Sequence, residues 1–69
     1  MQKEIFIMTI YVRQNENGTW HVYIEGRSIK EAASLNYQAA VAVAKNLKNN
    51  NGGNATIIGD EKGNQWIIE

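Results

Sequence analysis

Apolar residues recur at helical spacing between Leu35 and Asn51, which read Leu-Asn-Tyr-Gln-Ala-Ala-Val-Ala-Val-Ala-Lys-Asn-Leu-Lys-Asn-Asn-Asn. Asn36 is suited to cap such a helix, because its side-chain oxygen can accept from a free N–H of the first turn. The glycine pair Gly52-Gly53 can adopt the left-handed conformation that ends one. The apolar stripe consists of Tyr37, Ala40, Val41, Ala44 and Leu47. We predict one helix whose alanine-rich face lies close against a sheet.

Two apolar segments before the helix predict a β-hairpin. The segment Ile5 to Val12 is apolar at both alternating sets of positions, as in a strand buried on both faces. The sequence Asn15-Glu16-Asn17-Gly18-Thr19 has the chemistry of a three-residue loop with glycine in the left-handed region. This loop predicts the pairs Thr9–Glu25, Ile10–Ile24, Tyr11–Tyr23, Val12–Val22 and Arg13–His21. The inner face then consists of Phe6, Met8, Ile10, Val12, Trp20, Val22 and Ile24.

A second hairpin is expected after the helix. Asn54 to Gly59 and Gln65 to Glu69 flank the loop Asp60-Glu61-Lys62-Gly63-Asn64, which repeats the layout of the first loop. The same register would place Ile58 opposite Trp66, Ile57 opposite Ile67 and Thr56 opposite Ile68. Two inward sets remain open, namely Ala55, Ile57 and Ile67, or Ile58, Trp66 and Ile68.

Together these elements predict a single α+β domain over residues 1–69. Its order is ββαββ, with a four-stranded antiparallel sheet and one helix packed on one face. Between Gly26 and Leu35, Ser28 and Glu31 have the spacing of a capping box, which would begin a short helical turn. An irregular edge segment is the alternative there.

One helix covers only one face of such a sheet, and the other face would stay apolar. Soluble monomers rarely expose contiguous apolar patches beyond a few hundred Å². Chains this short also need a disulfide, a metal or a partner to add stability, and this one has no cysteine. We therefore predict an interface, through which the chain forms a homodimer or binds a host protein. The predicted interface residues are Ile5, Ile7, Tyr11, Arg13, His21, Tyr23, Ile58 and Trp66.

The charge of the chain bears on nucleic-acid binding. Tyr11, Tyr23, His21 and Arg13 would lie together and are similar in kind to aromatic platforms that stack single-stranded bases. Such platforms lie in basic surroundings, whereas seven basic and seven acidic residues give this chain a net charge of zero. Nucleic-acid binding is therefore the least favoured of the three alternatives.

Catalytic and metal-binding chemistry finds no support in the sequence. The chain has one histidine and no cysteine, and we expect no catalytic, cofactor-binding or metal-binding residues. Ser28 and Ser34 have ordinary capping roles. The apolar run from Ile5 to Val12 is too short to span a bilayer, so we expect no membrane segment and a cytoplasmic protein.

The predicted order, Trp20-His21-Val22, Gly52-Gly53 and the Gly63 turn together resemble a family of small bacterial ββαββ domains of unknown function. That family has a W-x-V strand, a helix rich in Glu and Ala, a glycine pair and a D-G turn. This chain differs in Asn36 to Ala40, where the family tends to have Thr and an acidic residue before Ala. The resemblance implies a fold and no functional residues.

The start of the helix carries a second resemblance. Ala32-Ala33-Ser34-Leu35 through Ala39 is similar to the helix start of small phage-encoded inhibitors, among them some anti-CRISPR proteins. Such proteins act by occupying a surface of a larger host complex, without catalysis. This resemblance implies a host protein or nucleoprotein complex as the partner.

Overall fold

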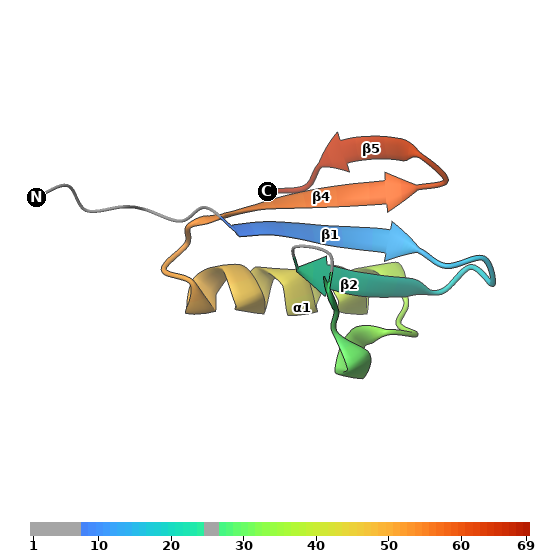
Figure 1. Cartoon of the computed structure of the whole chain (residues 1–69), viewed down its shortest axis with the longest axis horizontal. Coiled ribbons are helices and arrows are strands. Elements are labelled where there is room, and N and C mark those ends of the chain that lie inside the picture. Colours follow the sequence, from blue (N-terminus) through green and yellow to red (C-terminus); the bar gives the residue numbers. More distant parts are fainter. Residues whose placement is uncertain (1–7, 25–26) are drawn as a thin grey trace, which may run out of the picture.

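In the computed structural model of the protein, one α-helix packs on one face of a mixed β-sheet (Figure 1). The structure describes residues 8–24 and 27–69. The elements are β1 (Met8–Gln14), β2 (Trp20–Ile24), β3 (Arg27–Ser28), the 3-10 helix η1 (Lys30–Ala32), α1 (Tyr37–Asn50), β4 (Ala55–Glu61) and β5 (Asn64–Ile67). The α+β class and the ββαββ order of the longer elements are confirmed, and the two-residue β3 is an addition.

The helix α1 is the one that the apolar spacing predicts. The side-chain oxygen of Asn36 accepts from the N–H of Ala39 at 2.8 Å, so Asn36 is its N-cap. Ala40 and Ala44 are fully buried. The chain leaves the helix through Gly52 and Gly53, whose φ angles of 66° and 80° lie in the left-handed region. The small buried side chains let α1 lie close to the sheet.

The first hairpin has the predicted register. Val12 pairs with Val22, Tyr11 with Tyr23 and Arg13 with His21, and Ile10 also pairs with Ile24 as predicted. The N–H of Asn15 donates to the carbonyl of Thr19 at 2.6 Å, and Gly18 has a φ of 91°. The predicted pair of Thr9 with Glu25, and the predicted roles of Ile5, Phe6 and Ile7, lie outside the described residues.

The sheet is not purely antiparallel, which corrects the predicted topology. Its strand order is β3-β2-β1-β4-β5, and β1 and β4 are parallel neighbours. After β2 the chain turns back through β3 and η1, and Leu35 pairs with Trp20 at the start of β2. Consequently α1 runs opposite to β1, and β4 begins beside the start of β1 and follows its direction (Figure 1).

The segment before α1 is a short helical turn, as one of the two alternatives predicted. Its N-cap, however, is Ile29, which gives no side-chain hydrogen bond, rather than Ser28. Ser28 belongs to β3 and pairs with Tyr23. The capping-box interpretation of Ser28 and Glu31 is therefore wrong, because Ser28 extends the sheet edge instead.

The second hairpin is shifted by one residue from the predicted register. Ile58 pairs with Ile67, Gly59 with Trp66 and Glu61 with Asn64. The turn contains only two residues, Lys62 and Gly63, with φ angles of 53° and 88°. Positive φ at both positions is the geometry of a type I′ turn, which suits the twist of a hairpin. A shift by one residue moves side chains to the other face of the sheet.

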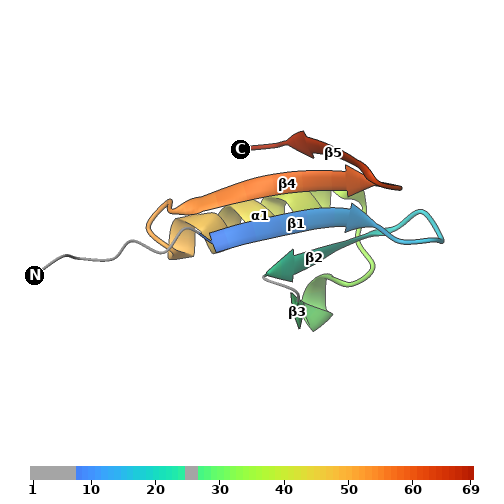
Figure 2. The ribbon, with the colours of Figure 1, turned by 45° about the horizontal axis from the view of Figure 1, so that its top comes forward.

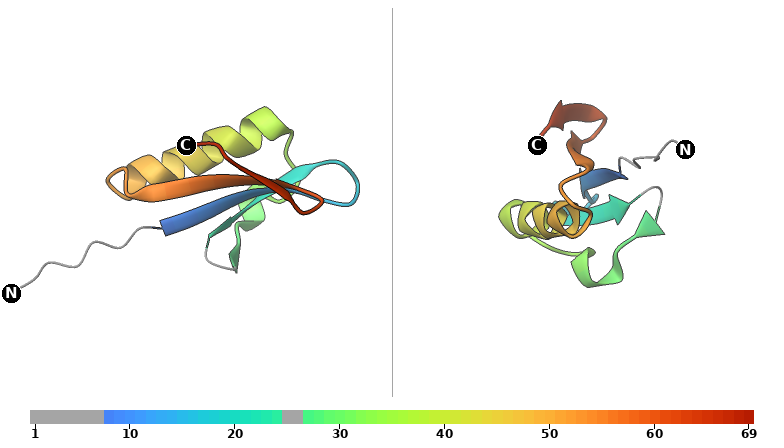
Figure 3. Two further views of the ribbon diagram at one scale, coloured as in Figure 1. Left: turned by 90° about the horizontal axis from the view of Figure 1, so that it is seen from above. Right: turned by 90° about the vertical axis from the view of Figure 1, so that its left-hand side faces the viewer.

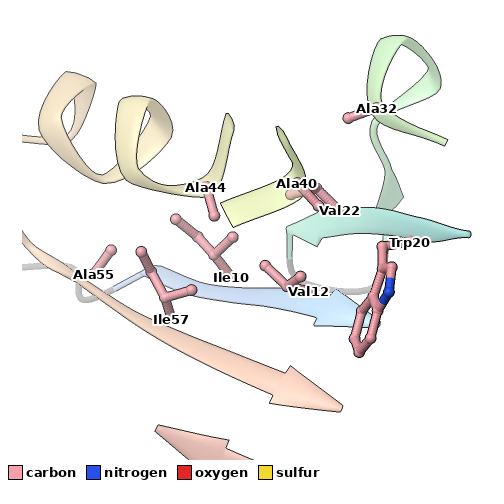
Figure 4. Close-up of a cluster of buried hydrophobic side chains, with 9 residues drawn as sticks. All are labelled: Ile10, Val12, Trp20, Val22, Ala32, Ala40, Ala44, Ala55 and Ile57. Carbon is pink, nitrogen blue, oxygen red and sulfur yellow. The ribbon is translucent and has the colours of Figure 1, made fainter. Parts of the chain in front are cut away.

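The core lies between α1 and the sheet, and its side chains come from α1, η1 and three strands. Ile10, Val12, Val22 and Ile57 are fully buried there (Figure 4). The helix lies behind β1 and β4 in Figure 2 and to one side of the strands in Figure 3. The buried apolar side chains of the sheet are therefore turned toward α1.

Trp66 belongs to the core side of the sheet and closes one end of it. Its ring lies over Gly59, where an added Cβ would overlap the indole. The indole N–H donates to the hydroxyl of Tyr37 at 3.3 Å, and Trp20 lies within 6.2 Å of Trp66, centroid to centroid. Because Trp66 and Ile57 share this face, neither of the two predicted inward sets is correct.

Replacing Gly59 by alanine should destabilise the fold by about 1–3 kcal/mol, since the new methyl group would force the Trp66 ring out of place. Urea unfolding followed by circular dichroism measures this cost.

In a Trp66→Leu background, the same Gly59→Ala change should be neutral or slightly stabilising, because the clash is gone and alanine restricts the unfolded chain. An equal cost in both backgrounds would contradict the packing of Trp66 over Gly59.

Candidate interaction face of the sheet

The face of the sheet opposite α1 carries two adjacent rows of side chains, which we call the open face. The apolar row runs across β2, β1, β4 and β5 as Tyr23, Tyr11, Ile58 and Ile67. The polar row beside it runs across the same strands as His21, Arg13, Asp60 and Gln65. Side chains alternate between the two faces along a strand. Val12, Ile57 and the residues opposite them point to α1, so the residues of these two rows point away from it.

The apolar row is partly exposed to solvent, and most exposed at its β5 end. Tyr23, Tyr11 and Ile58 are partly exposed. Ile67 at the end of the row is 68% exposed, and it is the large hydrophobic residue that stands out as exposed in the described chain. The row therefore offers a strip of apolar surface that crosses four strands.

Asp60 is the centre of the polar row and is almost fully buried. Its carboxylate lies 3.3 Å from Nε of Arg13 and accepts from the side chain of Gln65 at 3.1 Å and the N–H of Gly63 at 3.0 Å. The hydrogen bond from Gln65, aided by Gly63 and the charge of Arg13, lowers the pKa of Asp60 although burial opposes this. Asp60 is thus a fixed anion that also holds the β4–β5 turn.

Arg13 joins the two rows. Its guanidinium lies over the rings of Tyr23 and Tyr11, 5.2 Å and 5.7 Å from their centroids. Such cation–π contacts are worth about 0.5–1 kcal/mol at exposed sites. The arginine charge is therefore shared between a carboxylate and two rings of its own chain.

His21 is held neutral by its neighbours. The side-chain amide of Asn15 donates to the carbonyl of Ala33 at 2.9 Å and to the hydroxyl of Thr19 at 3.0 Å. Its oxygen is left to accept from Nδ1–H of His21, and in the neutral ring Nε2 then carries no proton. That Nε2 is buried and has no hydrogen-bond partner among the described residues. Burial, and then the charge of Arg13, lowers the pKa of His21.

Five of the eight predicted interface residues lie together on the open face, namely Tyr11, Arg13, His21, Tyr23 and Ile58. Trp66 does not, because the two-residue turn places it over Gly59 on the helix side. Ile5 and Ile7 lie outside the described residues. Asp60, Gln65 and Ile67 were not predicted, although the correct hairpin register would have placed all three on this face.

Neither a protein-family model nor a solved structure matches the chain. Within residues 8–24 and 27–69, no cluster of three or more His, Cys, Asp or Glu side chains could hold a metal ion. In the same part of the chain, no helix has the length and apolar character needed to cross a membrane. The likeness to bacterial ββαββ domains and to phage inhibitors stays a prediction.

The environment of His21 predicts a loss of stability at mildly acidic pH. The unfolded chain binds a proton at the usual histidine pKa near 6.5, whereas the folded chain keeps His21 neutral to a lower pH. Stability should therefore be full above pH 6.5 and fall as the pH drops toward the folded pKa, by at most about 1.4 kcal/mol per pH unit for one proton.

Urea unfolding of the wild type and of His21→Gln at a series of pH values between 7 and 5 measures this effect. His21 is the only histidine, and glutamine can still donate to Asn15, so the variant should lose the slope in this range. The same slope in both proteins would show that His21 titrates normally in the fold.

Proposed function

We propose that this chain is a non-catalytic protein-interaction domain that packs the open face of its sheet against that of a second copy. The observation that supports this most is the apolar row of Tyr23, Tyr11, Ile58 and Ile67, which crosses four strands on the uncovered face. Two sheets packed face to face would bury both rows, as the two sheets of a β-sandwich do.

The gain from apolar burial supports association. Burying about 500 Å² of apolar surface, summed over the two copies, would contribute on the order of 12 kcal/mol before the cost of association is subtracted. A domain of this length is stable by only about 3–10 kcal/mol on its own. A second copy would therefore add stability that the small single core does not supply.

The polar row favours a second copy over a charged partner. In a two-fold interface the same patch of each copy meets the other, so a patch with a net charge would meet the same net charge. Here Arg13 and Asp60 form an ion pair within one chain, and His21 is neutral. Two such faces can approach without like-charge repulsion.

The contacts that Asp60 and His21 make within the chain support a non-catalytic role. Asp60 already receives Arg13, Gln65 and Gly63, and the pKa of His21 is lowered by burial rather than tuned by a carboxylate. A general acid or base needs a proton-bearing atom within reach of a substrate. Both groups instead hold the sheet and its loops.

Arg13 also argues against single-stranded nucleic acid as the ligand. Its guanidinium lies over the two tyrosine rings on which bases would stack, and Asp60 neutralises it. An inhibitor of a host protein, as the second resemblance implies, would use the same open face on a different partner. A monomeric chain in solution would favour that alternative.

Sedimentation velocity at micromolar concentration tests the proposal. The wild type should sediment as an assembly of at least two copies, and Tyr23→Asp and Ile58→Asp should each shift it to a smaller species, because each buries a charge in the interface. Gln38→Asp is the matched control, since Gln38 is exposed on α1.

Far-ultraviolet circular dichroism should show that all three variants are folded. If Gln38→Asp weakens association as much as Tyr23→Asp does, the open face is not the interface.

A further inference from the structure

The two edges of the sheet differ in whether other segments of the chain cover them, and the edge beside β2 is covered. Trp20 and Leu35 exchange two backbone hydrogen bonds of 2.7 Å and 2.8 Å, and the N–H of Ile29 donates to the carbonyl of Val22 at 2.9 Å. Beyond them, Ile24 pairs with Arg27 of β3. These chain segments therefore cover the outer edge of β2.

The β5 edge, by contrast, has no neighbour among the described residues. Opposed residues in an antiparallel hairpin alternate between pairs that exchange hydrogen bonds and pairs that do not. Glu61 and Asn64 flank a two-residue turn and are a bonded pair, and the N–H of Ile68 donates to Ile57 at 2.8 Å in the same alternation. Gln65 and Ile67 are therefore unbonded pairs, and their N–H and C=O groups point away from β4. In the part of the chain that is described, no strand lies beyond β5.

Nothing in the sequence of β5 protects this edge. Proteins commonly blunt exposed edges with lysine, proline, a bulge or an inward-pointing charge. Asn64, Gln65, Trp66 and Ile67 include no charge and no proline, and Ile67 is 68% exposed. Glu61 and Lys62 belong to β4 and the turn, and Glu69 after β5 is turned toward α1, where it lies 3.6 Å from Lys45 and 3.8 Å from Lys48.

We propose that β5 pairs antiparallel with β5 of a second copy about a two-fold axis. The register that places Gln65 opposite Ile67 of the second copy uses every outward group of both residues in both chains, in four hydrogen bonds. Trp66 then lies opposite Trp66 of the second copy. Shifting the register by two residues would place half of these groups opposite the turn, or opposite Glu69, whose N–H already donates to Ile57. This register is therefore the best match of the edge with itself.

This edge contact goes beyond the proposed function, because it uses main-chain groups that the open face does not. The two-fold axis is perpendicular to the sheet, so both open faces lie on the same side of one continuous sheet. Two such sheets can pack face to face, which gives an assembly of four copies with two kinds of two-fold contact. The edge dimer and the face dimer can each form without the other.

The sharpest test is total chemical synthesis of the chain with a methyl group on the backbone nitrogen of Ile67. This change removes one outward donor per copy and blocks close pairing, while every side chain is kept. Sedimentation equilibrium should show association at the edge weakened at least about tenfold relative to the unmodified synthetic chain. A recombinant pair repeats the test, since Ile67→Pro removes the N–H and Ile67→Ala does not.

The masses separate the two contacts. With both present, the wild type should reach four copies, the N-methylated chain should stop at two through the open face, and Tyr23→Asp should stop at two through the edge. Combining the two changes should give a monomer. An unchanged mass and dissociation constant after N-methylation would overturn the edge contact and leave the open face intact. A wild type that stays monomeric at millimolar concentration would overturn both.

Discussion

The backbone pairing of Trp20 with Leu35 is the constraint on which the arrangement of the sheet depends. It returns the chain to the start of β2 before α1 begins, so α1 runs opposite to β1 and β4 must follow the direction of β1. A helix leaving directly from the end of β2 would have given the antiparallel order that the sequence suggests. The same pairing covers the outer edge of β2, which leaves β5 as the bare edge of the described sheet.

The sequence predicted correctly those elements whose structure depends on residues close together in the chain. The loop from Asn15 to Thr19 was sufficient for the register of the first hairpin, and Asn36 was sufficient for the start of α1. The predicted register of the second hairpin was wrong because Lys62, which lacks the conformational freedom of glycine, has a positive φ beside Gly63. The parallel pairing of β1 with β4 was not predicted for another reason. No local sequence signal indicates that the ten residues before α1 reverse the direction of the chain.

The part of the candidate site that lies on the first hairpin was predicted from the sequence. Tyr11, Arg13, His21 and Tyr23 follow from that register, and Ile58 is on the open face as expected. Trp66 was placed on the wrong face. Asp60 was assigned to the second loop and Gln65 to the strand after it, with no role for either. In the structure Asp60 is buried and organises Arg13, Gln65 and the turn, which depends on strand neighbours that are far apart in sequence.

The two-residue turn at Lys62 and Gly63 decides the core, the open face and the β5 edge together. It directs Trp66 onto Gly59, where the indole closes the core, and it leaves Ile67 at the end of the apolar row. It also decides which main-chain groups of β5 point outward, because bonded and unbonded pairs alternate from the turn. A three-residue loop would have placed Trp66 on the uncovered side and turned different N–H groups to the edge. The positive φ of Lys62 therefore helps to determine both surfaces through which we propose that this chain binds a second copy.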